Sequence, residues 1–266
     1  MSSTPQPPPS EWLIPDWPAP AAVRALCTTR AGGVSLGPYV SLNLGTHVGD
    51  ALQAVEQNRA RLASSLGARP VFLDQVHGTH MLALQPDTQD GQAAEGAFTR
   101  ERALACTVMV ADCLPILLCD TQGRTVAAVH AGWRGLAGVD GVGVVEQICK
   151  QFRPFALVER AQTAMEIIAW LGPCIGPAAF EVGDEVRAAF VGDTAQAADA
   201  FAPVGQGKWL ADLAALARGR LQAQGVTQVY GNDSSAPWCT VGNPSQFFSY
   251  RRDGFSGRMA ACIWLG

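Results

Sequence analysis

Three short apolar runs, each ending beside a residue that can bind a metal, constrain this chain more than any other feature. The runs cover 71–76, 106–111 and 124–129, and their length and apolar content predict buried strands. The first run leads into His77, the second into Cys113 and the third into His130. A potential metal ligand therefore stands at each of three transitions from strand to loop.

The rest of the pattern alternates helices with strands and predicts a mixed α/β (α+β) fold. Apolar residues at helical spacing predict helices, and short apolar runs between turn residues predict strands. Residues 247–263 are predicted to form two strands around a turn at Asp253 and Gly254. The predicted helices cover 51–66, 139–152, 177–190 and 210–224. The remaining predicted strands cover 23–29, 166–171 and 227–230.

The start of the chain is set apart by its prolines. Seven of the 17 prolines lie in residues 1–20, which predicts an extended tail. We expect this tail to dock through Trp12, Leu13, Ile14 and Trp17. No later linker and no internal repeat is visible, so residues 21–266 are predicted to form a single catalytic domain.

Composition and charge narrow the class of protein. The sequence has 48% hydrophobic and 16% charged residues, which is typical of a compact globular protein. Its net charge of −4 offers no basic field for a nucleic-acid partner. The chain has no export signal and no apolar stretch long enough to span a membrane, so we predict a soluble, cytoplasmic protein without a membrane partner. Its eight cysteines are scattered without a CxxC pair, which favours free thiols over disulfides.

Histidine is scarce, so any metal centre must also use cysteine or carboxylate. Of the four histidines, His47 and His80 have small or polar neighbours and are expected on the surface. His77, Cys113 and His130 form a Cys-His₂ set, and three protein ligands with an open fourth position are typical of catalytic zinc. Zinc there would keep the cysteine as a thiolate and activate a water molecule for attack on an electrophilic carbon.

Other interpretations of this set stay open. The spacings of 36 and 17 residues match no short zinc motif, and a histidine at a strand end can simply bind a backbone carbonyl. Alternatively, Cys113 is a nucleophile that a nearby histidine activates for acyl transfer. Gln75, on the same strand face as His77, could orient a substrate or water. Asp112 should point away, either to support a histidine or to cap the next segment.

Several arginines could recognise anions. Arg59 lies on the apolar face of the helix predicted over 51–66, between Val55 and Leu62, so its charge must either be paired internally or face a ligand. Arg30 precedes a glycine-rich turn with free backbone N–H groups. Arg251 is a further candidate, because one of the two adjacent arginines of the terminal segment must face inward.

Together these motifs resemble the YfiH-like family. That family was long labelled multicopper polyphenol oxidoreductase or laccase, and its members are now described as purine nucleoside phosphorylases with adenosine deaminase activity. The resemblance extends from about Thr28 to the C-terminus. The motifs that carry it are SLNLG at 41–45, QVHG at 75–78, ADCLP at 111–115, VHAGWRG at 129–135, GPCIG at 172–176, FEVG at 180–183 and FFSYRRD at 247–253.

The resemblance implies a single α/β domain of layered mixed sheets flanked by helices. It implies zinc at His77, Cys113 and His130, with purine nucleosides and inorganic phosphate as partners of a monomer or weak homodimer. Asn43 and Arg59 match family positions near the substrate, and Arg30, Gln75 and Arg251 fall in matching motifs. Glu95 departs from the family, which often has aspartate there.

The implied chemistry has two parts. In phosphorolysis, inorganic phosphate attacks C1′ of adenosine, inosine or guanosine as the glycosidic bond breaks. In deamination, activated water attacks C6 of adenosine. Amide hydrolysis of a peptidoglycan precursor remains an alternative. So does copper-dependent phenol oxidation, although four histidines are too few for a multicopper cluster. A zinc-stabilised binding module is a further alternative, against which the open coordination position argues.

Overall fold

Two large β-sheets dominate the fold of this computed structural model, which describes residues 9–152, 166–192 and 195–266. Within those residues, the four-stranded sheet has the order β1 (Val23–Cys27), β13 (Met259–Leu265), β5 (Leu104–Val110), β2 (Arg69–Phe72). The six-stranded sheet has the order β12 (Gln228–Gly231), β8 (Ile167–Leu171), β6 (Leu114–Asp120), β7 (Val126–Ala131), β4 (Gly96–Thr99), β3 (Met81–Ala83). Both sheets mix parallel with antiparallel pairs.

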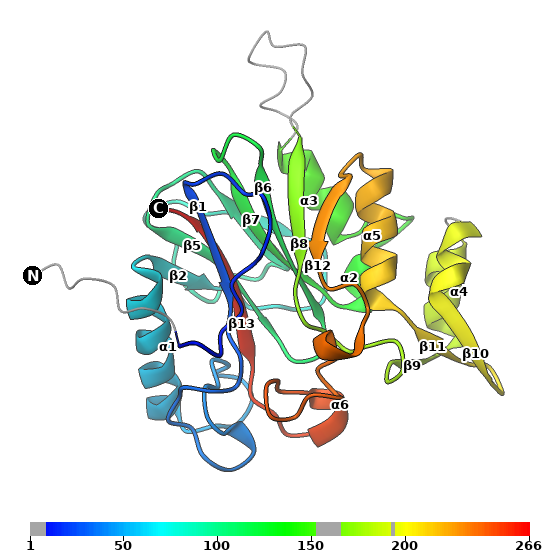
Figure 1. Cartoon of the computed structure of the whole chain (residues 1–266), viewed down its shortest axis with the longest axis horizontal. Helices are drawn as coiled ribbons and strands as arrows, with labels where there is room; N and C mark the ends of the chain where they lie inside the picture. Colours follow the sequence, from blue (N-terminus) through cyan, green and yellow to red (C-terminus); the bar gives the residue numbers. More distant parts are fainter. Residues whose placement is uncertain (1–8, 153–165, 193–194) are drawn as a thin grey trace, which may run out of the picture.

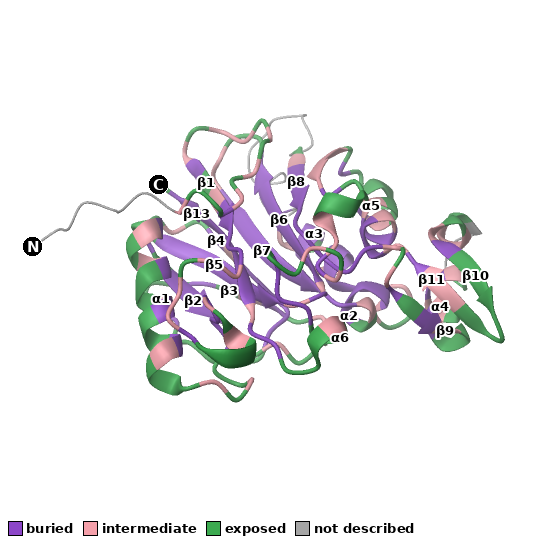
Figure 2. Cartoon of the chain, turned by 60° about the horizontal axis from the view of Figure 1, so that its bottom comes forward, coloured by how far each residue is buried: buried purple, intermediate pink, exposed green. Residues whose placement is uncertain are grey.

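The two sheets pack face to face, and β13 shows how the core is divided. Its residues Ala261 and Ile263 belong to the apolar cluster between the sheets. The alternate residues Cys262 and Trp264 face the other way and pack with helix α1 (Leu52–Leu66). A strand buried on both faces lacks the polar alternation of a surface strand. Figure 2 shows the central strands β5, β6 and β7 buried along their length, whereas α1 exposes its outer face.

Helices cover the outer face of the six-stranded sheet as well. Helices α2 (Trp133–Ala137), α3 (Val144–Phe152) and α5 (Leu213–Ala223) bury their apolar sides against it. The result is four layers in the order helix, sheet, sheet, helix (Figure 1). This arrangement confirms the predicted mixed α/β fold with layered sheets. None of the helices in the described residues is long and apolar enough to cross a membrane.

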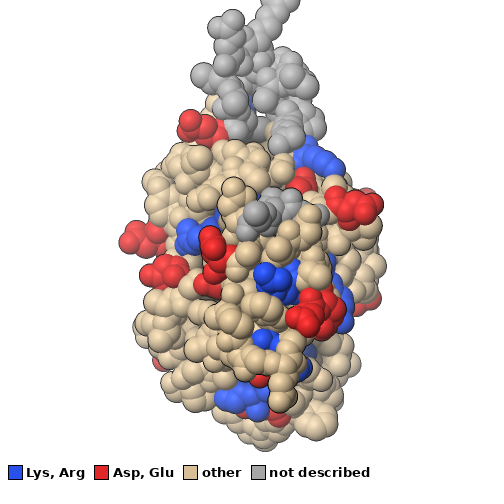
Figure 3. All heavy atoms as spheres, turned by 90° about the vertical axis from the view of Figure 1, so that its right-hand side faces the viewer, with Lys and Arg blue, Asp and Glu red and all other residues tan. Residues whose placement is uncertain are grey.

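A smaller unit projects at the right of Figure 1. It contains β9 (Glu181–Gly183), α4 (Asp184–Val191), η3 (Ala195–Ala200), β10 (Phe201–Gly205) and β11 (Lys208–Ala211). The helix predicted over 177–190 is therefore wrong in its first half, because Val182 pairs with Trp209 in an antiparallel ladder and the helix begins only after Gly183. On the face seen in Figure 3, positive and negative side chains of the described residues are interspersed.

The C-terminal hairpin predicted over 247–263 is wrong. Residues 250–253 form the short helix α6 (Tyr250–Asp253), and only β13 follows as a strand. The helix forms because Ser249 Oγ and Asp112 Oδ2 accept hydrogen bonds from the backbone N–H groups of Arg252 (3.2 Å) and Arg251 (2.7 Å). β13 finds its partners in β1 and β5, far away in the sequence.

Most predicted helices and strands exist, with shifted ends. Helix α1 matches the prediction and ends at Gly67, whose φ of 61° is left-handed; its N-cap, however, is Ala51 rather than Asp50. Helix α3 begins at Val144 instead of 139, after a turn in which Gly138 and Gly141 have positive φ.

In the proline-rich segment Trp12 is buried and Leu13 pairs with Cys27, but Ile14 is 60% exposed, so its predicted docking is wrong. Residues 1–8 of that segment lie outside the described residues. Two further short helices are η1 (Gly37–Tyr39) and η4 (Ala236–Trp238).

Candidate active site

The three predicted metal ligands converge at the end of the two sheets that lies near α6. Cys113 occupies the tight connection from β5 in one sheet to β6 in the other, His130 is on β7, and His77 follows β2. Their ligand atoms all lie within 4.8 Å of one another. Sγ of Cys113 is 3.9 Å from Nε2 of His77, and the two imidazole rings meet edge to face with centroids 5.0 Å apart.

The local backbone makes this convergence possible. Asp112, next to Cys113, has a φ of 91°, and His77 has a φ of 62°, so both turns pass through the left-handed region. Gly132 faces the site from the turn after β7. A Cβ on Gly132 would lie 3.0 Å from Cδ2 of His77 and 3.2 Å from Sγ of Cys113. The glycine of the His-Ala-Gly motif therefore leaves room for two of the ligands.

Glu95, on the turn that opens β4, supports the site from behind. Its Oε2 lies 2.7 Å from Nδ1 of His130, and its Oε1 accepts a hydrogen bond from the backbone N–H of Gly78 at 3.0 Å. A proton on Nδ1 leaves Nε2 of His130 free to bind a metal, and a carboxylate behind a ligating histidine is a common arrangement. Asp112 contacts neither histidine: its carboxylate accepts from Thr240 Oγ1 (2.6 Å) and the backbone N–H of Arg251.

The charges of the site are coupled. Burial opposes ionisation of Cys113, but the neighbouring His130 and His77 outweigh it and lower the pKa of the thiol to about 6. Burial likewise opposes protonation of His130, but the Cys113 thiolate and the Glu95 carboxylate raise its pKa to about 9. Without a metal, both pKa shifts favour a thiolate at Cys113 beside an imidazolium at His130. A metal ion that binds His130 must displace its proton.

The donor set fits one zinc ion. Zinc bonds of about 2.1 Å to nitrogen and 2.3 Å to sulfur place tetrahedral ligand atoms roughly 3.6 Å apart. The distance of 3.9 Å between Sγ of Cys113 and Nε2 of His77 needs only a slight approach to reach that value. In the part of the chain that the structure describes, this is the one group of three or more side chains arranged to hold a metal.

A cavity of about 490 Å³ opens in front of these ligands. Its volume suits a small molecule, and its walls combine aromatic, cationic and acidic side chains. His47, which was expected on the surface, is exposed and is also part of the lining. The cavity is lined by His47, Asp74, Gln75, His77, Met109, Ala111, Asp112, Cys113, His130, Trp133, Ile175, Phe180, Leu213, Tyr250, Arg251 and Arg258.

Comparison with known proteins identifies relatives that cover nearly the whole chain. A family model described as multi-copper polyphenol oxidoreductase laccase matches residues 24–266. The chain is 48% identical to a purine nucleoside phosphorylase of Pseudomonas aeruginosa, with 96% of this chain and 98% of the relative covered. It is 47% identical to the purine nucleoside phosphorylase YfiH of Escherichia coli K12, with 96% and 99% covered. The chain belongs to the YfiH-like family.

Solved structures agree with this assignment and confirm the resemblance inferred from the motifs. A crystal structure of a Neisseria meningitidis protein matches the YfiH-like chain with a TM-score of 0.86 and 46% identity, over 96% of this chain and 99% of that one. A YfiH protein of Bacillus licheniformis matches with a TM-score of 0.82 and 30% identity, over 92% and 93%.

Two predicted substrate residues of the YfiH-like chain, Gln75 and Arg251, line the cavity. The Gln75 amide both donates to the carbonyl of Met109 and accepts from its N–H, at 2.8 Å each, so it fixes the end of β5. Arg251 reaches across the cavity wall, where its Nη1 donates to the carbonyl of Glu181 (3.1 Å) and its guanidinium lies over Phe180.

Three other predicted residues lie outside the cavity lining, and their substrate roles stay predictions. Arg30 donates to the carbonyls of Val40 and Pro244. Arg59 donates to the carbonyl of Leu44, stacks on Phe72 at 3.8 Å and lies 3.9 Å from Asp90, so an internal ion pair is present but long. Asn43 is fully buried and bonded within its own loop and to Arg258.

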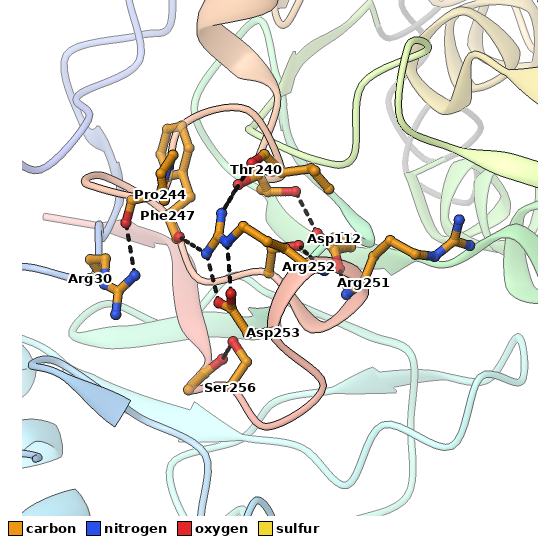
Figure 4. A network of polar contacts seen from close by, with 12 residues as sticks. Arg30, Asp112, Thr240, Pro244, Phe247, Arg251, Arg252, Asp253 and Ser256 are labelled. Carbon is orange, nitrogen blue, oxygen red and sulfur yellow. Dashed lines mark hydrogen bonds and ion pairs between the residues drawn. The ribbon is translucent and has the colours of Figure 1, made fainter. Parts of the chain in front are cut away.

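Helix α6 is held rigidly beside the cavity by a network of polar contacts (Figure 4). Arg252 donates to the carbonyls of Thr240 (2.7 Å) and Phe247 (3.1 Å) and pairs with Asp253 at 2.7 Å. Asp112 ties the start of the helix to the connection that carries Cys113. The side chain of Arg251 points away from this network. The sequence motif FFSYRRD thus fixes one cavity wall rather than forming a strand.

The thiols give a simple test of the site's charge state. We expect iodoacetamide at pH 7 to modify Cys113 first in metal-free protein, because only the thiolate reacts and its pKa is about 6. Burial holds the pKa of Cys106, Cys119 and Cys174 above the ordinary value. Peptide mass mapping over time measures the order of modification. Equal labelling of Cys113 and the buried thiols would contradict this charge state.

Proposed function

We propose that this chain is a zinc-dependent purine nucleoside phosphorylase. Its substrates would be adenosine, inosine or guanosine with inorganic phosphate, and its products the purine base and ribose 1-phosphate. We propose adenosine deamination as a second activity of the same cavity. The observation that carries the proposal is the convergence of a thiolate and two imidazoles in a cavity of about 490 Å³ with aromatic and cationic walls. The names of the relatives, purine nucleoside phosphorylase, support the same reaction.

The donor set favours zinc over copper as the resident metal. One thiolate and two imidazoles form a three-ligand set that is typical of catalytic zinc. When bound, zinc would act as a Lewis acid that activates water for the deamination. Glu95 would keep the proton on Nδ1 of His130 and so hold the ring in its metal-binding orientation.

Different walls of the cavity are suited to the purine, the ribose and the phosphate. We assign the planar purine to the aromatic side, formed by Trp133, Phe180 and Tyr250, because flat bases pack against such rings. Asp74 is exposed at the cavity and can accept hydrogen bonds from ribose hydroxyls. Cationic side chains on the remaining wall would hold inorganic phosphate. A phosphate oxygen then bonds to C1′ while the purine leaves with the electron pair of the glycosidic bond and takes up a proton.

An amide hydrolase is the second candidate, and one observation favours it. The neighbouring His130 lowers the pKa of the Cys113 thiol to about 6. A low thiol pKa beside a histidine is typical of an activated cysteine nucleophile. Such an enzyme would release no purine base from a nucleoside, so product analysis separates the two candidates.

The test is chromatography of the products formed from adenosine with and without inorganic phosphate. We expect adenine only in the presence of phosphate, and inosine in both reactions. A Cys113→Ala preparation, purified in the same way, controls for contaminating enzymes and should form neither. Absence of both products from the unmodified protein would refute the proposal. Adenine release without phosphate would show a hydrolase instead of a phosphorylase.

A further inference from the structure

Arg258 is a cationic side chain of the cavity that no sequence motif pointed to. It lies between α6 and β13, and its backbone is clamped by the segment 41–45. Its N–H donates to Oδ1 of Asn43 (2.9 Å), and its carbonyl accepts from the N–H of Leu44 (3.1 Å). The same Oδ1 accepts from the N–H of Gly45 (2.9 Å). Two segments more than 200 residues apart are thus locked together at this arginine.

The side chain of Arg258 reaches the cavity through space that a glycine provides. A Cβ on Gly45 would lie 2.8 Å from Cγ and 3.3 Å from Cβ of Arg258, closer than atoms can pack without a shift. The SLNLG motif at 41–45 therefore supplies both the hydrogen-bond clamp, through Asn43, and the open path, through Gly45. This explains why Asn43 is fully buried and yet belongs to the neighbourhood of the site.

In the described part of the chain, the guanidinium of Arg258 has no carboxylate within ion-pair distance. Within residues 9–152, 166–192 and 195–266, no carboxylate forms an ion pair with it, whereas Arg252 pairs with Asp253 at 2.7 Å. The carboxylate of Asp112 is already occupied by Thr240 and the N–H of Arg251. Burial lowers the pKa of Arg258 by more than the nearby Cys113 and Asp112 raise it. A partly buried cation that makes no ion pair with a carboxylate favours an anionic ligand.

The donors of Arg258 are only partly used. Its Nη1 donates to the carbonyls of Ser256 (2.8 Å) and Gly257 (3.2 Å), which fixes the plane of the guanidinium. Its Nε and Nη2 donate to no acceptor of the described residues. A fixed guanidinium with two free donor groups is suited to a tetrahedral oxyanion, because phosphate oxygens accept paired N–H bonds from arginine.

We propose that Arg258 binds the inorganic phosphate in this cavity and that Asn43 is its positioning residue. The proposal rests on the proposed phosphorylase function and names the residue that holds its second substrate. It separates Arg258 from Arg59 and Arg30, whose guanidinium groups are engaged by protein carbonyls outside the cavity. Arg251 lies on the same lining but is exposed and tied to Glu181.

The test is titration calorimetry of the protein as purified with inorganic phosphate. We expect Arg258→Gln to weaken phosphate binding by at least about 10-fold, since a charge-assisted hydrogen bond is lost. Arg258→Lys keeps the charge but not the planar donors, so its phosphate affinity should lie between those of the unmodified protein and Arg258→Gln. Arg61→Gln is the control, because Arg61 is exposed on α1 and donates only to the carbonyl of Gly32. Circular dichroism shows whether each variant is folded.

Steady-state kinetics then tests the role of Asn43. Asn43→Ala should raise the KM for phosphate more than the KM for the nucleoside, whereas general damage to the fold would lower kcat without this split. Unchanged phosphate affinity in folded Arg258→Gln would overturn the proposal. If the unmodified protein neither binds phosphate nor cleaves nucleosides, the proposed function itself fails. If it does both and Arg258→Gln matches it, only the role of Arg258 fails.

Discussion

Replacing Cys113 with alanine is expected to remove the bound metal and at least about 100-fold of the phosphorolysis rate. Cys113 supplies the only thiolate of the group and carries the negative charge that offsets a divalent cation. The sulfur lies 3.9 Å from Nε2 of His77, so its loss leaves two imidazoles and a gap where the third ligand stood. Elemental analysis of the purified variant and its rate with inosine and phosphate measure the two effects.

Cys239→Ala is the matched control for this substitution. Cys239 is half-buried like Cys113, but its sulfur accepts from the backbone N–H groups of Gly176 (3.3 Å) and Gly242 (3.4 Å) outside the cavity. We expect this variant to keep its metal. A Cys113→Ala protein that retains both metal and full rate would contradict the assignment of the ligands. Loss of activity with the metal retained would favour the nucleophile role of Cys113 instead.

Replacing Glu95 with glutamine is expected to weaken zinc binding by about 10- to 100-fold, as is usual for the partner of a ligating histidine. Burial opposes ionisation of Glu95, but the hydrogen bonds from His130 and the backbone of Gly78, together with the charges of His130 and His77, outweigh burial and lower the pKa of the carboxyl. The carboxylate is therefore charged at neutral pH and holds the imidazole from 2.7 Å. The amide keeps the shape but removes the charge. Competition with a zinc chelator measures the affinity.

The contact between Glu95 and His130 makes the stability of the fold depend on pH. Because the pKa of Glu95 is lower in the folded protein than in the unfolded chain, the carboxylate stabilises the fold above its ordinary pKa and loses this effect as the pH falls through the lowered value. Glu95→Gln should flatten this acid limb of thermal stability. Glu181→Gln, at an exposed position on β9, should leave both zinc affinity and the acid limb unchanged. Equal effects of the two substitutions would contradict the special role of Glu95.

The convergence of His77, Cys113 and His130 could be predicted from the sequence because each residue follows an apolar run that can be recognised without its neighbours. Glu95 could not be assigned to them, because it opens the short strand β4, and its partner His130 lies 35 residues away. Only the pairing of β4 with β7 brings the two side chains together. The local sequence pattern therefore located the three candidate ligands but not the carboxylate that contacts one of them.

The C-terminal segment shows the opposite case, in which a local pattern was misleading. Its aromatic residues and the Asp-Gly pair are typical of a hairpin, yet Asp112 caps α6 from more than 100 residues away. Arg258 was missed for a related reason: its clamp, Asn43, lies 215 residues earlier. The order of the strands also depends on tertiary pairing, because β13 lies between β1 and β5 and no sequence period encodes that order.

The most direct test is a zinc titration of metal-free protein, followed by the rate of inosine phosphorolysis. One ion held by His77, Cys113 and His130 should give a rate that rises linearly and breaks at one zinc per chain. Copper at the same concentration should not restore the full rate. Full phosphorolysis before any zinc is added, or no phosphorolysis at any zinc concentration, would contradict a zinc-dependent nucleoside phosphorylase at this cavity.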